Sequence, residues 1–222
     1  MKIALVCGMK QEAAILGKPD NAVVIVGAGD AVKLAADLHA AIDGGCTHVL
    51  SFGTCGALNQ AIKVGEIVVA GMMVDPPASS LFCDAAWSKN LRDLSGGRPV
   101  VGTVSAATVA TAADKAALYA ATKADVVDME SWIAAAVAHA RGVPFAMLRA
   151  VSDAADQDVP PAALAAMDET GGVDAWGVIE SLGHDDEQLS ALLDLADSAD
   201  LAFAALAKAL ADIGINYGVP TP

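Results

Sequence analysis

The chain has 222 residues, of which 55% are hydrophobic, 4% aromatic and 18% charged, and its formal net charge is −14 at pH 7. This composition predicts one α/β domain with closely packed helices, and it argues against a sandwich rich in aromatic residues. Because phosphate backbones and anionic lipids are bound by clustered Lys and Arg, the acidic balance argues against nucleic-acid binding and against electrostatic attachment to membranes.

The start of the chain and the cysteines predict a cytoplasmic protein. The segment MKIALVCGMKQE returns to charge too soon for a signal peptide. The longest stretch without Asp, Glu, Lys or Arg, 44–62, contains polar residues and glycines, so we expect strands and a loop there and no transmembrane helix. The four cysteines form no CxxC pair and the four histidines have no ligand spacing, so we expect free thiols and no metal site.

The first half of the chain alternates short apolar runs with helical patterns, which predicts strands that are covered on both faces. Strands are predicted at 3–7, 22–26, 47–52 and 67–74. A helix or turn is predicted at 9–16, and Asp30 is expected to cap a helix that ends near residue 42. Small-residue loops are predicted after the second and third strands, at 27–29 and 53–56.

The second half begins with a looser segment, 76–98, which we interpret as a loop or an interface element with a short helical pattern around Trp87. The further predicted elements are strands at 100–104, 126–129 and 145–151, and helices at 111–121, 130–140, 161–167, 176–182 and 187–213. Together these elements predict a single domain, 1–215, built as a three-layer α/β sandwich. Its central sheet is expected to be mixed, mostly parallel and flanked by helices, and the tail 216–222 is expected to fray.

Carboxylates and glycines gather at the predicted carboxyl ends of the strands, where ligands bind in α/β sheets. Glu12 follows the first strand, Glu130 stands at a strand-to-helix junction, and Asp153 follows the last predicted strand. Each has a structural alternative, since Glu130 suits a helix start and Asp153 suits a cap. Cys7 and Cys55 are expected to be core residues. The co-occurrence at one sheet edge therefore predicts an acid/base site.

Four segments resemble the purine nucleoside phosphorylase and nucleosidase superfamily in order and approximate spacing over roughly residues 1–157. They are GMKQEAAIL, LSFGTCGAL, IKVGEIVVA and VVDMESWIAAAVAHARGVPFAMLRAVSDAADQ. The motifs DMES and RAVSD are specific as a pair. GMKQE and SDAADQ are similar to the methylthioadenosine/S-adenosylhomocysteine nucleosidases. The second half also resembles the hopanoid-associated phosphorylases, which are assigned to removing adenine from adenosylhopane.

The resemblance implies cleavage of the N-glycosidic bond of a purine nucleoside, with adenine as the expected base and without a cofactor. It implies that Asp153 protonates N7 of the purine, that Glu130 binds the ribose hydroxyls and that Glu12 activates water. Met129 is expected to pack on the sugar. The other positions that the resemblance assigns to substrate binding are Gly8, Gly53, Thr54, Cys55, Asp128 and Ser152.

The nucleophile is predicted to be water, because the phosphate-binding loops of the superfamily carry arginines that this chain lacks. Lys10 and Thr54 are the nearby candidates for a phosphate site. Arg149 lies within a predicted strand and is expected to be paired and structural. No aromatic residue is evident that would stack on the base. A further hypothesis is that five apolar residues line a wide mouth that accepts a bulky 5′ substituent. The alternative is that each of them lies in the core or at a subunit interface. The five residues are Met72, Met73, Leu81, Phe82 and Trp87.

Members of the superfamily form dimers or larger rings, so a homodimer is expected. A lipid-linked nucleoside as substrate would place the enzyme at the membrane periphery. Two other functions stay open. A methylthioadenosine/S-adenosylhomocysteine-type nucleosidase would turn over methylthioadenosine rapidly, and a nucleoside-binding protein without catalysis would bind adenine without releasing it from a nucleoside.

Overall fold

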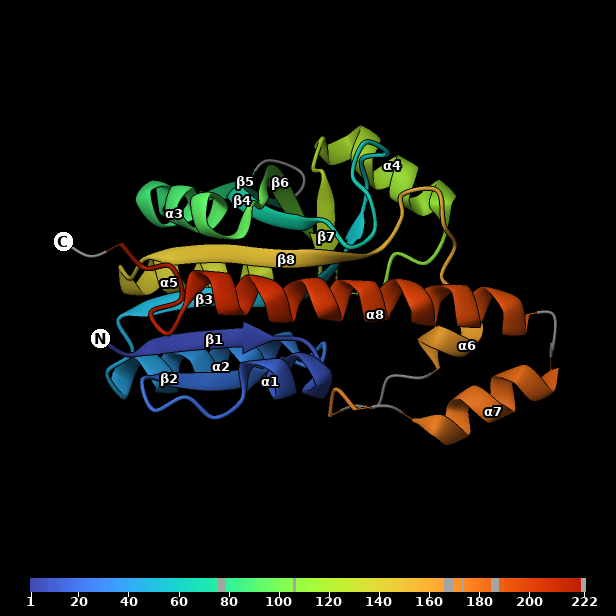
Figure 1. The fold of residues 1–222 in the computed structure, drawn as a ribbon, viewed down its shortest axis with the longest axis horizontal. Helices are drawn as coiled ribbons and strands as arrows, with labels where there is room; N and C mark the ends of the chain where they lie inside the picture. The colour runs from blue at the N-terminus through green and yellow to red at the C-terminus, as the bar shows by residue number, and fades with distance from the viewer. Residues whose placement is uncertain (76–78, 106, 166–169, 173, 185–187, 221–222) are drawn as a thin grey trace.

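Figure 1 shows the computed structural model, which describes residues 1–75, 79–105, 107–165, 170–172, 174–184 and 188–220. The strands are β1 Ile3–Cys7, β2 Ala22–Val26, β3 His48–Ala57, β4 Ile67–Asp75, β5 Ser79–Phe82, β6 Arg98–Val104, β7 Val126–Asp128 and β8 Phe145–Asp153. The helices are α1 Lys10–Leu16, α2 Ala31–Asp43, α3 Ala85–Ser95, α4 Ala112–Thr122, α5 Ser131–Arg141, α6 Pro161–Leu164, α7 Ala175–His184 and α8 Gln188–Ile213.

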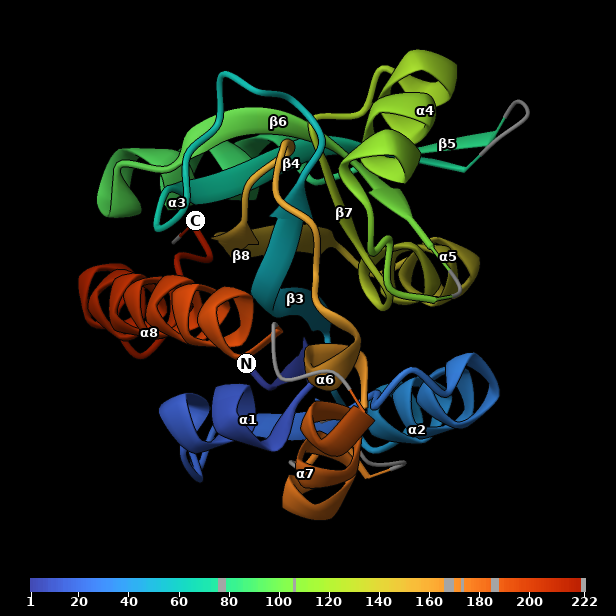
Figure 2. The ribbon, with the colours of Figure 1, turned by 90° about the vertical axis from the view of Figure 1, so that its right-hand side faces the viewer.

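These strands form one mixed sheet in which parallel pairings predominate. The order is β2-β1-β3-β7-β6-β4-β5, and β8 pairs with both β3 and β4. The pairs β1–β2, β1–β3, β3–β8, β4–β6 and β6–β7 are parallel, whereas β3–β7, β4–β5 and β4–β8 are antiparallel. Since β8 and the pair β7–β6 connect β3 to β4 by two routes, the pairings close in a ring, and the sheet curls accordingly in Figure 2.

Helices cover both faces of this sheet (Figure 2). On one face, Leu34 and Leu38 of α2 pack in a core cluster with Ala134 and Ala138 of α5. On the other face, a second cluster joins α1, α3 and α8, with Trp87 and Leu91 of α3 beside Leu206 of α8. The predicted α/β class, with a central mixed sheet flanked by helices, is therefore confirmed. No helix within the described ranges combines the length and the apolar character needed to cross a bilayer.

The small-residue loop predicted at 53–56 is wrong, because these residues belong to β3. Gly53 pairs with Arg149 and Thr54 with Ala150 in the parallel ladder between β3 and β8. The backbone of these residues is hydrogen-bonded to the buried strand β8. This pairing keeps the glycines extended, although glycine has a low intrinsic preference for strands. The extension carries the site residues of β3 to the sheet edge.

The looser segment predicted at 76–98 contains regular structure, and β6 also starts at Arg98 instead of residue 100. β5 pairs antiparallel with the end of β4. Asp84 caps α3, since its side chain accepts a hydrogen bond from the backbone N–H of Trp87 at 2.8 Å. Residues 76–78 lie outside the described residues, as do 166–167 of the helix predicted at 161–167 and residue 187 of the last one.

The C-terminal tail is packed rather than frayed as far as the structure describes it. Tyr217 is 4% exposed. The indole Nε1 of Trp87 donates to the carbonyl oxygen of Tyr217 at 2.8 Å, and Asn90 donates to that of Gly218 at 2.8 Å. The prediction of fraying is therefore wrong for the first residues of the tail, and residues 221–222 lie outside the described residues.

Candidate active site

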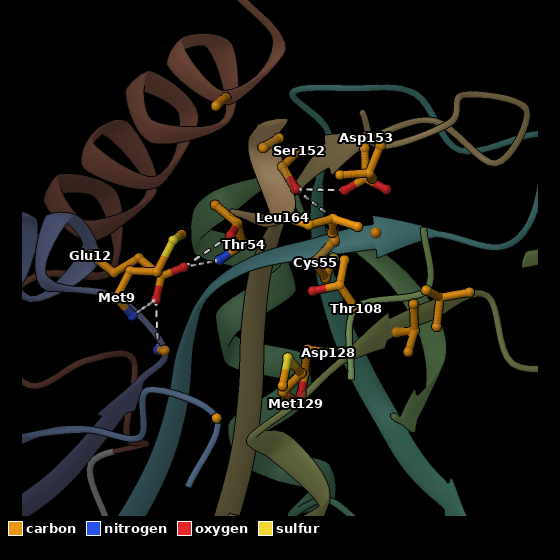
Figure 3. Close-up of a pocket in the computed structure, with 18 of the residues that line it drawn as sticks. Met9, Glu12, Thr54, Cys55, Thr108, Asp128, Met129, Ser152, Asp153 and Leu164 are labelled. Carbon is orange, nitrogen blue, oxygen red and sulfur yellow. Dashed lines mark hydrogen bonds between the residues drawn. The ribbon is translucent and has the colours of Figure 1, made fainter. Parts of the chain in front are cut away.

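A cavity with a volume of about 500 Å³ lies at the carboxyl ends of β1, β3, β7 and β8. The three carboxylates predicted to act in catalysis, Glu12, Glu130 and Asp153, all line it. Figure 3 shows two of them with the neighbouring side chains of β3, β7 and β8. The structure thus brings together segments that are more than a hundred residues apart. The other predicted substrate-binding residues that line the cavity are Gly8, Thr54, Cys55, Asp128, Met129 and Ser152.

Glu12 lies in the first turn of α1, is 1% exposed and is held by four hydrogen bonds. Its Oε2 accepts from the backbone N–H of Gly8 at 2.7 Å and of Met9 at 3.0 Å. Its Oε1 accepts from the backbone N–H of Thr54 at 2.7 Å and from the Thr54 hydroxyl at 3.0 Å. These four donors fix the carboxylate in one position. Gly53, predicted to bind substrate, does not line the cavity and lies behind Glu12, where a Cβ atom would be 2.6 Å from Oε1.

Glu130 stands at the N-terminus of α5 and is 6% exposed. Its Oε2 lies 3.4 Å from Nη2 of Arg149. Burial raises the pKa of Glu130 to about 7, and the charge of Arg149 lowers it only in part. The fold therefore keeps this carboxyl group out of water at the cavity wall, with Arg149 as its charged partner.

The side chain of Asp128 caps the N-terminus of α5. Its Oδ1 accepts from the backbone N–H groups of Glu130 at 2.9 Å and of Ser131 at 2.7 Å. Its Oδ2 lies 3.2 Å from Nε of Arg149, an ion pair whose alignment is too poor for a hydrogen bond. Both oxygens thus contact protein groups, so Asp128 supports Glu130, and its own role in substrate binding stays a prediction.

Arg149 is paired, as predicted, and it also contributes to the cavity wall. It is 1% exposed and donates to the carbonyl oxygen of Thr54 at 2.9 Å and to the Ser51 hydroxyl at 2.7 Å. Its guanidinium also contacts the carboxylates of Asp128 and Glu130, so its charge is paired within the protein. Arg149 therefore links β8 to β3 and to the end of β7 at the site.

Asp153 reaches the cavity through an irregularity in β8. Cys55 pairs with Val151, but Gly56 pairs with Asp153, so Ser152 is an extra residue in the strand. Such bulges re-aim side chains and are common beside active sites. Both Ser152 and Asp153 line the cavity, and the Ser152 hydroxyl donates to Oδ1 of Asp153 at 2.9 Å (Figure 3).

Lys115 of α4 is a neighbour of the site that sequence reasoning missed. Its ammonium lies 2.6 Å from Oδ2 of Asp153, and the residue is 0% exposed. A signal was present in the sequence, because Lys115 is three and four residues before Leu118 and Tyr119 and so shares the apolar face of the helix. A lysine on such a face is buried only with an acidic partner, which the sequence alone does not identify.

The apolar wall of the cavity comes from α6, α8 and the segment before α6. Phe203 of α8 supplies an aromatic ring that the sequence had not placed at the site. The hypothesis of an apolar mouth is wrong for Met73, which is 0% exposed, and for Trp87, which is 1% exposed, because both lie in the core. The alternative reading of these two as core residues is confirmed. The other three residues of that hypothesis, Met72, Leu81 and Phe82, do not line this cavity. The apolar residues that line the cavity from this side are Val159, Ala163, Leu164, Leu192, Leu195, Ala196, Ala199 and Phe203.

Lys10 lies away from the cavity wall. It is exposed, and its ammonium contacts the hydroxyl of Thr170. Cys7 and Cys55 are buried free thiols, and burial raises the pKa of Cys7 to about 12, so that thiol stays protonated. Within the described ranges, no three His, Cys, Asp or Glu side chains come together in a way that would hold a metal ion.

The chain matches a family model described as the phosphorylase superfamily over residues 19–172. The chain belongs to this superfamily. The match includes Glu130 and Asp153 but begins after Glu12. Membership confirms the family that the motifs indicated, and with it the prediction of an enzyme of the phosphorylase and nucleosidase type. No curated protein matches the chain.

Solved structures share the fold of this superfamily member over nearly its whole length. S-adenosylhomocysteine nucleosidase from Streptococcus pyogenes is 16% identical, with a TM-score of 0.69, and the match covers 100% of this chain and 98% of that one. Futalosine hydrolase of Helicobacter pylori is 18% identical, with a TM-score of 0.68 and coverage of 94% and 97%. A 5′-methylthioadenosine/S-adenosylhomocysteine nucleosidase from Colwellia psychrerythraea, in complex with adenine, is 16% identical, with a TM-score of 0.67 and coverage of 94% and 93%.

Proposed function

We propose that the protein hydrolyses the N-glycosidic bond of a purine nucleoside and releases the free base. The observation that carries the proposal is that Glu12, Glu130 and Asp153 line one cavity beside Met129. Breaking this bond places positive charge on the ribose and leaves an electron pair on the base. A carboxylate at the sugar and an acid at the base meet those two needs.

The three carboxylates divide the reaction between them. Asp153 gives its proton to N7 of the purine while the bond between C1′ and the base breaks and its electron pair stays with the base. Glu130 holds the ribose hydroxyls and offsets the charge on the sugar. Glu12, fixed by its backbone donors, takes a proton from the water that attacks C1′. The products are the neutral base and the free sugar.

Water is the proposed nucleophile because the cavity wall offers little to a phosphate dianion. Arg149 is the basic side chain among the described lining residues, and its guanidinium is already engaged by Asp128 and Glu130. Glu12 would repel a dianion. Lys10, the candidate for phosphate, contacts Thr170 outside the cavity wall.

The proposed substrate is an adenine nucleoside with an apolar 5′ extension. The wall formed by α6 and α8 supports this proposal, since it offers Leu164, Leu192, Leu195 and Phe203 to a ligand. Adenosylhopane, to which the resemblance points, carries such an extension. The structural neighbours favour a second candidate, because one is an S-adenosylhomocysteine nucleosidase and another was solved with adenine. Smaller 5′-thio substituents would use the same wall.

A panel of purine nucleosides with different 5′ groups tests the proposal when free base is measured with and without phosphate. We expect release of adenine at the same rate in both conditions, and a lower KM for the larger apolar 5′ groups. Asp153→Asn should lower turnover roughly 10²-fold or more. Asp156→Asn, at an exposed neighbouring carboxylate, is the matched control and should leave turnover unchanged. Strict dependence on phosphate would defeat the choice of water, and binding of nucleosides without base release would defeat the proposed activity.

A further inference from the structure

The ammonium of Lys115 is completely buried and makes three hydrogen bonds. It donates to Oδ2 of Asp153 at 2.6 Å, to the carbonyl oxygen of Ala154 at 2.9 Å and to that of Gln157 at 2.8 Å. An ammonium has three N–H donors, so none is left over. A buried cation is tolerated only when it is paired and hydrogen-bonded in this way.

The same contacts divide the two oxygens of Asp153. Lys115 binds Oδ2, whereas Oδ1 is contacted by the hydroxyl of its neighbour Ser152 at 2.9 Å. Gly56 leaves room for Oδ2 at this place, since a Cβ atom there would be 2.9 Å away from it. The carboxyl group is therefore oriented by Oδ2, and Oδ1 is the oxygen that remains for a proton and for the base.

We propose that Lys115 is a positioning residue for Asp153, a role that rests on the function proposed above. The carboxyl group carries its proton on Oδ1 while Oδ2 accepts from Lys115. As the bond to C1′ breaks, the proton moves from Oδ1 to N7 of the purine, and Asp153 becomes a carboxylate. The ammonium lies beside Oδ2 and offsets the negative charge that appears there. After the base has left, Asp153 takes up a proton from the solvent and Glu12 releases the proton that it took from the attacking water, so both groups return to their starting state.

This role predicts a dependence on the leaving group that a structural role does not. A purine leaves with the help of a proton, whereas 4-nitrophenolate is stable as an anion and leaves without one. Lys115→Met should therefore lower kcat for a purine nucleoside roughly 10²-fold or more, because the general acid is affected. It should change kcat for 4-nitrophenyl ribofuranoside, and KM for both substrates, by less than about threefold.

The experiment measures kcat and KM of the wild type, Lys115→Met and Asp153→Asn with both substrates. Lys89→Met is the matched control, because Lys89 forms an exposed ion pair with Asp93 on α3, away from the cavity. Equal losses on both substrates would show that Lys115 only supports the shape of the site and would overturn the proposal, as would an unchanged kcat for the purine nucleoside. Absence of base release by the wild type itself would instead reject the proposed function.

A double variant covers the case in which Lys115→Met does not fold or the wild type does not cleave the nitrophenyl substrate. Combining Lys115→Met with Asp153→Asn removes both charges together, which avoids an unpaired buried ion. If Lys115 acts through Asp153, the double variant and Asp153→Asn alone should release the purine at equal rates. A further loss in the double variant would contradict the proposal.

Discussion

Each carboxylate of the site lies against a glycine whose missing side chain makes room for it. Gly53 leaves space for Glu12, and Gly56 leaves space for Asp153, with Cβ positions 2.6 Å and 2.9 Å from the respective carboxylate oxygens. Gly8 lies 3.0 Å, measured from its Cβ position, from Oε1 of Glu130. Gly8, directly after β1, and the two glycines of β3 therefore allow close approach at the site, and this explains why β3 tolerates glycine.

Gly53→Ala tests this explanation. The added methyl group would collide with the carboxylate of Glu12, which has no room to move because four donors hold it. We expect kcat for base release to fall at least about tenfold, because the group proposed to activate water is displaced. Gly71→Ala in β4 has nothing within 4 Å of the new methyl group and should keep wild-type kcat. Equal activity of the two variants would contradict the role of Gly53.

Glu130 predicts a particular dependence of stability on pH. Its pKa is about 7 in the folded protein, against an ordinary value of 4.5 in the unfolded chain. Between these values the unfolded state releases a proton that the folded state keeps, so this group's contribution to stability is present below pH 4.5 and is lost as pH rises through about 7. The variant Glu130→Gln should not lose stability in this way, because glutamine does not titrate.

Chemical denaturation of both proteins measures the effect. The free energy of unfolding of Glu130→Gln, relative to wild type, should rise by about 1–3 kcal/mol between pH about 4.5 and about 8. Parallel stability curves for the two proteins over that range would mean that Glu130 does not titrate as its burial implies.

The sequence reveals the three carboxylates but not the groups that orient them. Glu12, Glu130 and Asp153 follow apolar runs at positions that also match family motifs, so pattern and resemblance agree. Lys115 stands in an alanine-rich helix, and only the fold brings it to Asp153. Phe203 is similar, since its place in the cavity depends on how α8 crosses the sheet.

At the scale of elements, α8 combines a structural and a proposed binding role. Its C-terminal half packs against the sheet through Ala202, Leu206 and Ala209, whereas its N-terminal half presents Leu192 and Leu195 to the cavity. One helix thus contributes to a core cluster and to the apolar wall of the cavity. Figure 1 shows α8 running alongside β8 toward α6.

Leu195→Lys tests the binding role of this wall. A charged side chain would have to be desolvated by an apolar 5′ group, so we expect KM for a nucleoside with a long apolar 5′ extension to rise about tenfold or more. KM for a nucleoside with an unmodified 5′ hydroxyl should change far less. Leu201→Lys on the same helix is the control, since Leu201 is 60% exposed and does not line the cavity. A similar rise in KM for both substrates would argue against an apolar 5′ site.

The tail beyond α8 is a second element whose role can be measured. Tyr217 is 4% exposed and belongs to the core cluster that joins α3 to α8. Tyr217→Ala should lower the free energy of unfolding by about 2–4 kcal/mol, because a large buried side chain is removed. Ile215→Ala, at a residue that is 82% exposed, should change it by less than about 0.5 kcal/mol. Similar values for both variants in urea denaturation would contradict the packing of the tail.

The type of an element could be predicted from the sequence where its hydrophobic run is unbroken. The boundary of an element could not be predicted where pairing with a distant strand determines it. β1 and β2 are found at the predicted residues. The end of β3 was missed because Gly53 and Gly56 are typical of loops, and only the ladder with β8 keeps them extended. β5 and α3 were obscured by prolines and serines between residues 76 and 98.

For the whole molecule, the ring of paired strands explains how distant segments meet. β3 pairs with β1, β7 and β8, so the ends of all four strands face one cavity. The acidic balance of the chain is compatible with a neutral nucleoside as ligand and with the absence of a free cation for phosphate along the described cavity wall. The homodimer and the place of a lipid-linked substrate stay predictions.

The most direct test is a crystal structure of the protein with a purine nucleoside analogue whose bond to C1′ resists hydrolysis. We expect N7, or the atom in its place, within hydrogen-bond distance of Asp153, and the sugar hydroxyls on Glu130. Glu12 should face C1′ from the side opposite to the base. An analogue bound with its base away from Asp153, or outside the cavity altogether, would contradict the assignment of the site.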